Sequence, residues 1–172
     1  MKSILFTIGF TKKTAEEFFR LLGGAQVQKL IDIRENRVGQ LAGFAKYPDL
    51  AFFLQQIAGI AYEYQHIFAP TAEIRDAYIE SRDWEKYENA FTELMTQRQV
   101  LDQVDSTAFE GRVALLCSEA EPEKCHRRLV AELLARHLIA QGHQIEIEHL
   151  VSVKPPRKIK PKKAPHARAD SV

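Results

Sequence analysis

The sequence predicts an α/β protein, a three-layer sandwich in which helices cover both faces of a mostly parallel five-stranded sheet. Short β-branched and apolar runs alternate with helical patterns along the chain, which is typical of parallel strands joined by helical crossovers. Three of the runs are almost continuously apolar, as strands are when both faces of a sheet are covered. The expected strands are residues 3–9, 29–34, 60–67, 112–118 and 144–151.

The first two helices are bounded by residues that commonly begin and end helices. Thr14 and Glu17 have the spacing of a capping box, in which each side chain bonds the backbone N–H of the other residue. Gly23 then ends the first helix. Pro48 suits the first position of a second helix, which Gly59 ends. These signals predict one helix after each of the first two strands.

Helical patterns also follow the third and fourth strands. Residues 122–141 are expected to form one long helix. Residues 71–105 carry large apolar side chains at three- and four-residue spacings, so we expect a helical insertion before the fourth strand. The side chains with that spacing are Trp84, Tyr87, Phe91, Leu94 and Met95.

The strand patterns also predict the order of the strands. Strands 60–67 and 144–151 alternate polar and apolar residues, as partly exposed edge strands do, whereas the other three are apolar throughout. The order 3-2-1-4-5 satisfies this difference. This order places the topological switch point, where the strand order reverses, between the first and fourth strands. Ligands bind beyond the carboxyl ends of the strands at such a point.

Length and composition favour a single domain outside the membrane. The chain has 172 residues, 45% hydrophobic and 27% charged, and we place one domain at residues 1–153. It lacks any run of about 18 apolar residues, so we expect no transmembrane helix and no membrane partner. Residues 4–10 are apolar but precede Thr-Lys-Lys instead of a small-residue cleavage site, so no secretory signal is expected. With only two cysteines, we expect a cytoplasmic protein with free thiols.

Residues 154–172 differ from the rest of the chain. They contain seven of the 24 basic residues and one of the 23 acidic residues, which leaves 17 basic and 22 acidic residues in 1–153. This segment is rich in proline and lysine and nearly free of apolar residues, so we expect a disordered tail. Its charge could bind nucleic acid without sequence specificity, or it could simply keep the protein in solution.

Polar and reactive residues gather where the expected strands end. Because the carboxyl ends of parallel strands meet at one edge of the sheet, the residues at these ends should lie close together. The connection 35–47 leaves from the same edge and is longer than the usual two to six residues, which favours a functional loop. The residues expected at this edge are Gly9, Asp32, Arg34, Cys117 and Glu119.

Asp32 and Arg34 are two residues apart and so share one face of the strand end. They could form an ion pair that satisfies local backbone groups. Alternatively, Arg34 binds an anion together with Arg127, while Asp32 and Glu119 act as acid and base. The sequence leaves both interpretations open.

Cys125, His126 and Arg127 stand near the expected start of the long helix. The positive end of the helix dipole and the arginine favour a thiolate at Cys125, yet Cys125 also aligns with Leu129 on the inner face of the helix. His126 could reach the site from the first turn. Cys117 could be a small apolar residue at the end of its strand, or the nucleophile of an enzyme.

A metal ion is a further candidate for this group. Cys117, Cys125 and His126 are ligand types that bind zinc, but the seven-residue spacer between the cysteines matches no standard zinc spacing, and no nearby pair completes four ligands. A disulfide between the two cysteines is geometrically open. The sequence names no cofactor.

Four segments carry a family resemblance. They are residues 7–9 (Thr-Ile-Gly), 31–34 (Ile-Asp-Ile-Arg), 43–44 (Gly-Phe) and 115–128, which contains Cys-x-Glu and Cys-His-Arg-Arg. Together they resemble the bacterial "domain of unknown function 488" family over about residues 3–151. Many members have histidine where this chain has Phe10, so this chain lacks that imidazole. The resemblance implies a cytoplasmic α/β domain with a site and no known reaction.

Three functional hypotheses follow. The first is an enzyme that acts on an anionic small molecule or a nucleotide-like substrate at the carboxyl edge of the sheet. The second is a nucleic-acid-associated module that uses residues 154–172. The third is a thiol-redox or metal-binding protein.

Overall fold

A five-stranded parallel sheet forms the centre of the molecule. The structure is a computed structural model that describes residues 2–39 and 42–152. Every neighbouring pair of strands in the sheet is parallel, so the predicted fold class is confirmed. The strands are β1 (Ser3–Gly9), β2 (Lys29–Asp32), β3 (Ala61–Tyr64), β4 (Arg112–Cys117) and β5 (Ile145–Leu150).

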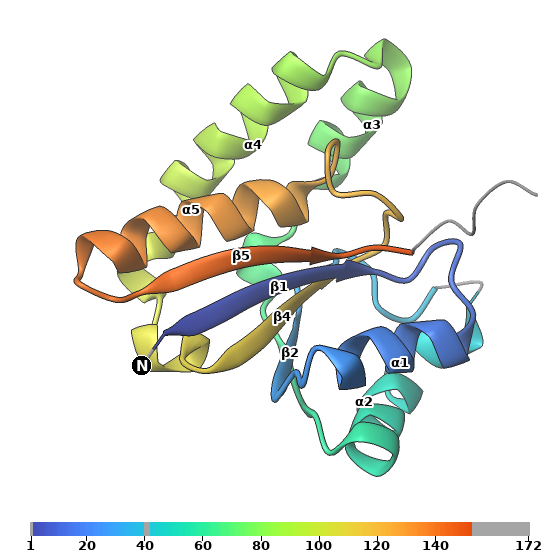
Figure 1. Cartoon of the computed structure of the whole chain (residues 1–172). Coiled ribbons are helices and arrows are strands. Elements are labelled where there is room, and N and C mark those ends of the chain that lie inside the picture. Colours follow the sequence, from blue (N-terminus) through green and yellow to red (C-terminus); the bar gives the residue numbers. More distant parts are fainter. Residues whose placement is uncertain (1, 40–41, 153–172) are drawn as a thin grey trace, which may run out of the picture.

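Helices cover both faces of the sheet and complete the three layers (Figure 1). Side chains that follow one another along a strand point to opposite faces, and in β1 Leu5 joins one core while Phe6 joins the other. One face carries α1 (Ala15–Gly24) and α2 (Asp49–Phe53), and the other carries α3 (Ala72–Ser81), α4 (Trp84–Gln97) and α5 (His126–Ala140).

The predicted order of the strands is wrong in one respect. The observed order is β3-β2-β4-β1-β5, so β4 lies in the middle and pairs with both β1 and β2. The edge strands β3 and β5 are as predicted. Because β1, β2 and β4 are all almost entirely buried, the apolar pattern separates interior strands from edges but does not rank the interior strands among themselves.

The central position of β4 decides where the site forms. Cys117, the last residue of β4, lies opposite Gly9 of β1. On its other side, the N–H of Ile33 donates a hydrogen bond to the carbonyl of Leu116. Cys117 therefore emerges between the ends of two neighbouring strands.

The helical elements near β4 match the prediction with changed boundaries. The expected insertion before β4 is present, but it consists of two α-helices, α3 and α4, followed by short 3₁₀ turns. The helix after β4 begins at His126 instead of residue 122. Residues 118–125 therefore form a loop, and Cys125 occupies the N-cap position of α5 with an extended backbone.

Within residues 2–39 and 42–152, no helix is both long and apolar enough to cross a membrane. The basic segment 154–172, with its expected disorder and nucleic-acid binding, lies outside the described residues.

Gly9 allows the loop after β4 to approach β1 closely. A Cβ atom at this position would overlap the backbone carbonyl of Glu119. We therefore predict that Gly9→Ala lowers the free energy of unfolding by about 1–3 kcal/mol, the usual range for overpacking a core. Urea unfolding measures the change. Gly23→Ala is the matched control, because a Cβ there meets nothing within 4 Å and alanine favours the helix. Equal stability of the two variants would contradict the prediction.

Candidate functional site

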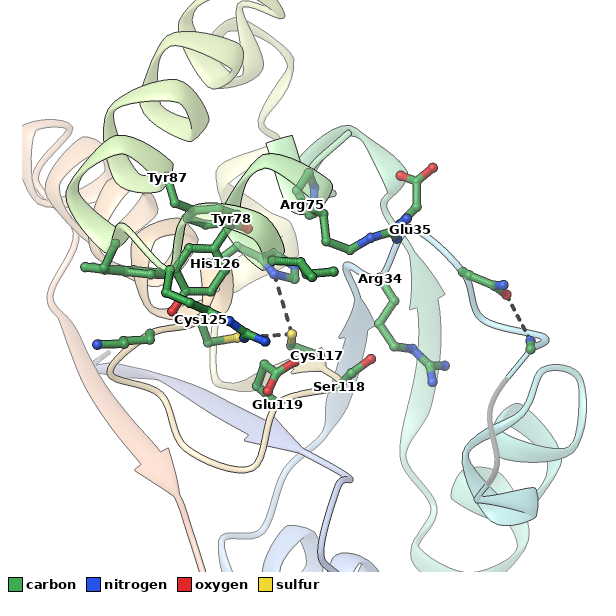
Figure 2. A pocket seen from close by; sticks show the side chains of 17 residues that line it. Arg34, Glu35, Arg75, Tyr78, Tyr87, Cys117, Ser118, Glu119, Cys125 and His126 are labelled. Atoms are coloured by element: carbon green, nitrogen blue, oxygen red, sulfur yellow. Dashed lines mark hydrogen bonds between the residues drawn. The ribbon is translucent and has the colours of Figure 1, made fainter. Parts of the chain in front are cut away.

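A cavity of about 570 Å³ opens at the carboxyl edge of the sheet. Its walls come from the loops after β2 and β4, from α3 and α4, and from the start of α5 (Figure 2). The residues that line it and concern the argument below are Arg34, Arg75, Tyr78, Arg82, Trp84, Tyr87, Cys117, Glu119, Lys124, Cys125 and His126.

Cys117 and His126 form a thiol–imidazole pair in this cavity. The Sγ atom of Cys117 lies 3.5 Å from Nδ1 of His126. The other ring nitrogen, Nε2, lies 3.1 Å from the carbonyl oxygen of Ile33. A carbonyl oxygen can only accept, so Nε2 carries a proton, and Nδ1 is the nitrogen that exchanges a proton with the thiol. The carbonyl of Ile33 thus orients the imidazole towards Cys117.

The surroundings of Cys117 favour its thiolate. Burial alone would raise the pKa of the Cys117 thiol, but the S–H of Cys125, the His126 ring and the backbone N–H of Glu119 bond to the sulfur and hold that pKa well below its usual range. Burial alone would lower the pKa of His126, but the negative charge on Cys117 and the hydrogen bonds to Cys117 and Ile33 raise it. Both shifts favour a thiolate on Cys117 and an imidazolium on His126.

Cys125 completes a cluster of two sulfur atoms and one imidazole. Its Sγ lies 3.1 Å from that of Cys117, and both cysteines are free and buried. Burial and the neighbouring Cys117 raise the pKa of the Cys125 thiol well above its usual range. Figure 2 shows the two sulfur atoms and the His126 ring facing one another. Cys125 therefore remains a thiol and donates its hydrogen to Cys117.

The same three residues could hold a metal ion. Their ligand atoms lie within 4.8 Å of one another, although the sequence spacing matched no standard zinc pattern. The bond from Nε2 of His126 to a backbone carbonyl is also usual for a histidine that ligates a metal.

Arg127 lies behind this cluster and is fully buried. Its guanidinium donates to the backbone carbonyls of Glu119 and Ala120, with 3.2 Å to the latter, and to Oγ1 of Thr7 at 3.3 Å. Nη1 also lies 3.6 Å from Sγ of Cys125. Arg127 does not line the cavity. Its contacts tie the loop after β4 to the sheet.

Asp32 and Arg34 form a buried ion pair beside the cavity. The Arg34 guanidinium donates to both carboxylate oxygens of Asp32, at 2.8 and 2.6 Å, and to the carbonyl of Ala45 at 2.9 Å. The hydroxyl of Tyr62 donates to Oδ2 of Asp32 at 2.8 Å. Asp32 is fully buried and does not line the cavity, and in Figure 2 the Arg34 side chain points away from the two sulfur atoms.

Glu119 and Gly9 occupy different parts of this edge. Glu119 lines the cavity and is exposed as a residue, but its carboxylate is partly buried there, and this partial burial together with the charge on Cys117 raises its pKa. Gly9 does not line the cavity but packs against the backbone of Glu119. Of the residues predicted from the sequence, the structure brings Arg34, Cys117, Glu119 and His126 to the cavity, together with Cys125.

Several lining residues were not predicted from the sequence. The cations Arg75, Arg82 and Lys124 line the cavity, as do the aromatic residues Tyr78, Trp84 and Tyr87. The Trp84 and Tyr87 rings stack at 5.0 Å with an interplanar angle of 22°. Arg75 lies in α3 and Arg82 is the C-cap of that helix, with a left-handed backbone, and nothing in the sequence shows that either side chain lies near Cys117.

The pKa directions of the two thiols predict different alkylation profiles. In Cys125→Ser, the His126 ring and the backbone N–H of Glu119 still lower the pKa of Cys117, so Cys117 should react with iodoacetamide at a rate that stays constant as pH falls through about 8.5, the usual thiol value. In Cys117→Ser, burial still raises the pKa of Cys125, so the rate at Cys125 should fall already above that pH. Mass spectrometry follows both reactions. Adding His126→Gln to the first variant should move its profile to higher pH, and identical profiles in all variants would contradict the assignment.

The ion pair predicts a role for Asp32 in stability. Asp32→Asn should lower the free energy of unfolding by about 3–5 kcal/mol, because it leaves a buried guanidinium without its counter-charge. Urea unfolding measures this, with the exposed Asp76→Asn as the matched control. A variant of unchanged stability would instead favour the catalytic interpretation of Asp32.

Comparison with known proteins agrees with the sequence resemblance. Residues 14–134 match the family described as "Domain of unknown function DUF488", and this range contains Cys117, Cys125, His126 and Arg127. No curated protein and no solved structure gave a match. Because the match covers well over half of the chain, this protein belongs to the DUF488 family.

Proposed function

We propose that the protein is a cysteine-dependent enzyme that acts on a small anionic, nucleotide-like substrate, with Cys117 as the nucleophile. The observation that carries this proposal is the alignment of Cys117, His126 and the Ile33 carbonyl, with distances of 3.5 and 3.1 Å. A nucleophile, a base within reach of it and a group that orients the base are the parts that nucleophilic catalysis requires.

The surrounding groups supply the remaining steps of such a reaction. The Cys117 sulfur bonds to an electrophilic atom of the substrate, and the bond to the leaving group breaks. Protonated His126 gives its proton to the leaving group, a task that Glu119 can share because its pKa is raised. Water then cleaves the bond to sulfur, and its proton returns to the imidazole.

The lining of the cavity supports the substrate class. Arg75, Arg82 and Lys124 provide positive charge that suits a phosphate or carboxylate group. The stacked Trp84 and Tyr87 rings and Tyr78 offer a surface for a planar ring. A volume of about 570 Å³ lies within the range of small-molecule sites.

This assignment changes the role given to two arginines by the sequence. The guanidiniums of Arg34 and Arg127 already bond to a carboxylate and to backbone carbonyls. We therefore assign anion binding to the cations of the cavity wall, and we assign Arg34 and Arg127 to positioning.

Nucleotide binding tests the proposal directly. Calorimetry with a panel of nucleoside mono- and diphosphates should find at least one ligand. The double variant Arg75→Ala/Arg82→Ala should weaken its binding by about tenfold or more, the loss expected for one or two charge-assisted hydrogen bonds. Arg20→Ala is the matched control, because Arg20 is exposed on α1, on the opposite face. Cys117→Ser should keep the ligand but not turn it over.

Three outcomes would overturn the proposal. The first is that no nucleotide of the panel binds. The second is equal affinity of the double variant and the control for every ligand bound. The third is a stoichiometric metal ion in protein purified without chelator that is lost in Cys117→Ser, which would assign the cluster to metal binding.

A further inference from the structure

The two cysteines of the chain are in contact but not bonded. Their Sγ atoms lie 3.1 Å apart, and the side chains are 3% and 2% exposed. Cys117 is the last residue of β4 and Cys125 is the N-cap of α5, so the pair joins a strand to a helix. We propose that this pair reacts with hydroperoxides, with Cys117 as the oxidised thiol and Cys125 as the thiol that resolves it to a disulfide. The reaction goes beyond the proposed function, since it uses the same nucleophile but none of its substrates.

The contacts distinguish the two roles. Cys117 faces Nδ1 of His126, which can protonate the alcohol that leaves a hydroperoxide. Cys125 faces Nη1 of Arg127 at 3.6 Å, a cation that supports its deprotonation during the second step. Both cysteines line the cavity, so a small peroxide reaches the sulfur atoms without opening the core.

The reaction has two steps, the oxidation of Cys117 and its resolution by Cys125, and both conserve atoms and electrons. The Cys117 thiolate attacks the terminal oxygen of ROOH, the O–O bond breaks, and RO⁻ takes a proton from His126 to leave as ROH. Cys117 is now a sulfenic acid, oxidised by two electrons. The Cys125 sulfur attacks the Cys117 sulfur, the S–O bond breaks, and the hydroxide leaves as water with the proton of Cys125. A dithiol reductant returns the disulfide to two thiols.

Little movement separates the thiols from the disulfide. The sulfur atoms must approach by about 1 Å to reach the bond length of about 2.05 Å. Cys125 has an extended backbone and stands before the first turn of α5, so its side chain can rotate without breaking the helix. The loop between the cysteines is held by Arg127 at Glu119 and Ala120, which keeps the sulfur atoms facing each other.

It follows that peroxide inactivates the site by forming the disulfide, and that a dithiol restores its activity by reducing it. In the disulfide, Cys117 is no longer a thiolate that can attack a substrate, and it has no proton to exchange with His126. Oxidation therefore inactivates the enzyme reversibly, whereas excess peroxide would carry a lone cysteine beyond the sulfenic acid to irreversible sulfinic acid.

Mass spectrometry of the full-length protein tests the proposal without any enzyme substrate. One equivalent of hydrogen peroxide should remove two hydrogens from the intact mass, and peptide mapping without reductant should find one intramolecular Cys117–Cys125 link that dithiothreitol reverses. The reaction should be about tenfold or more faster than that of free cysteine at the same pH, because Nδ1 of His126 lies 3.5 Å from the Cys117 sulfur and can protonate the departing alcohol.

The single variants assign the roles. Cys125→Ser should stop at a sulfenic acid that dimedone traps at Cys117, and Cys117→Ser should stay unmodified over the same time. Thermal unfolding of each variant confirms folding, and the mapping of the wild-type chain stands even if a variant fails to fold. The proposal is wrong if the wild-type thiols survive one equivalent of peroxide, or if the disulfide joins two chains.

The experiments distinguish a failure of the peroxide proposal from a failure of the proposed enzyme function. Inert thiols in a protein that still turns over a nucleotide would overturn the peroxide reaction alone. A disulfide in a protein that binds no nucleotide would leave the peroxide reaction standing and overturn the nucleotide substrate.

Discussion

The site depends on the hydrogen bonds of one buried side chain, the guanidinium of Arg127. Removing a guanidinium from water costs several kcal/mol unless its N–H groups find partners. Here the partners are the carbonyls of Glu119 and Ala120 and the hydroxyl of Thr7, which belong to the loop after β4 and to β1. Since Arg127 itself is in α5, one side chain joins three segments. The path of the loop, and with it the approach of Cys125 to Cys117, follows from those bonds.

A second constraint comes from the sheet. Because β4 lies between β1 and β2, Cys117 emerges where a backbone carbonyl of the neighbouring strand end, that of Ile33, is still free to accept a bond. His126 takes that bond and turns its other nitrogen to the sulfur. The fully buried Asp32–Arg34 pair supports the same strand end, and Arg34 reaches across to Ala45. The Cys117–His126 pair is therefore oriented by a backbone carbonyl and not by a third catalytic side chain.

Much of the fold could be predicted from the sequence, because period and burial are local properties. The edges β3 and β5 alternate, and the interior strands do not. The position of β4 could not be predicted. Long-range contacts decide which interior strands pair, and these contacts produce no periodic pattern in the sequence. Cys117, Glu119 and His126 were found because strand ends in a parallel sheet must meet. The role of Arg127 depends on the path of the loop after β4. The positions of Arg75 and Arg82 depend on the orientation of α3 and on the left-handed turn that ends it, and neither can be inferred from sequence spacing.

The cavity draws its two kinds of residue from two separate stretches of chain. The sulfur atoms, the imidazole and Lys124 come from β4, the loop after it and α5, while Arg75, Arg82 and the stacked rings belong to the segment from α3 to the start of α4, inserted between β3 and β4. Apart from Lys124, the residues assigned to recognition are therefore physically separate from the reactive ones. Substitutions in the inserted helices can retune which molecule is held and leave the thiol chemistry intact. A single scaffold of this kind can diversify its ligands while keeping one reaction.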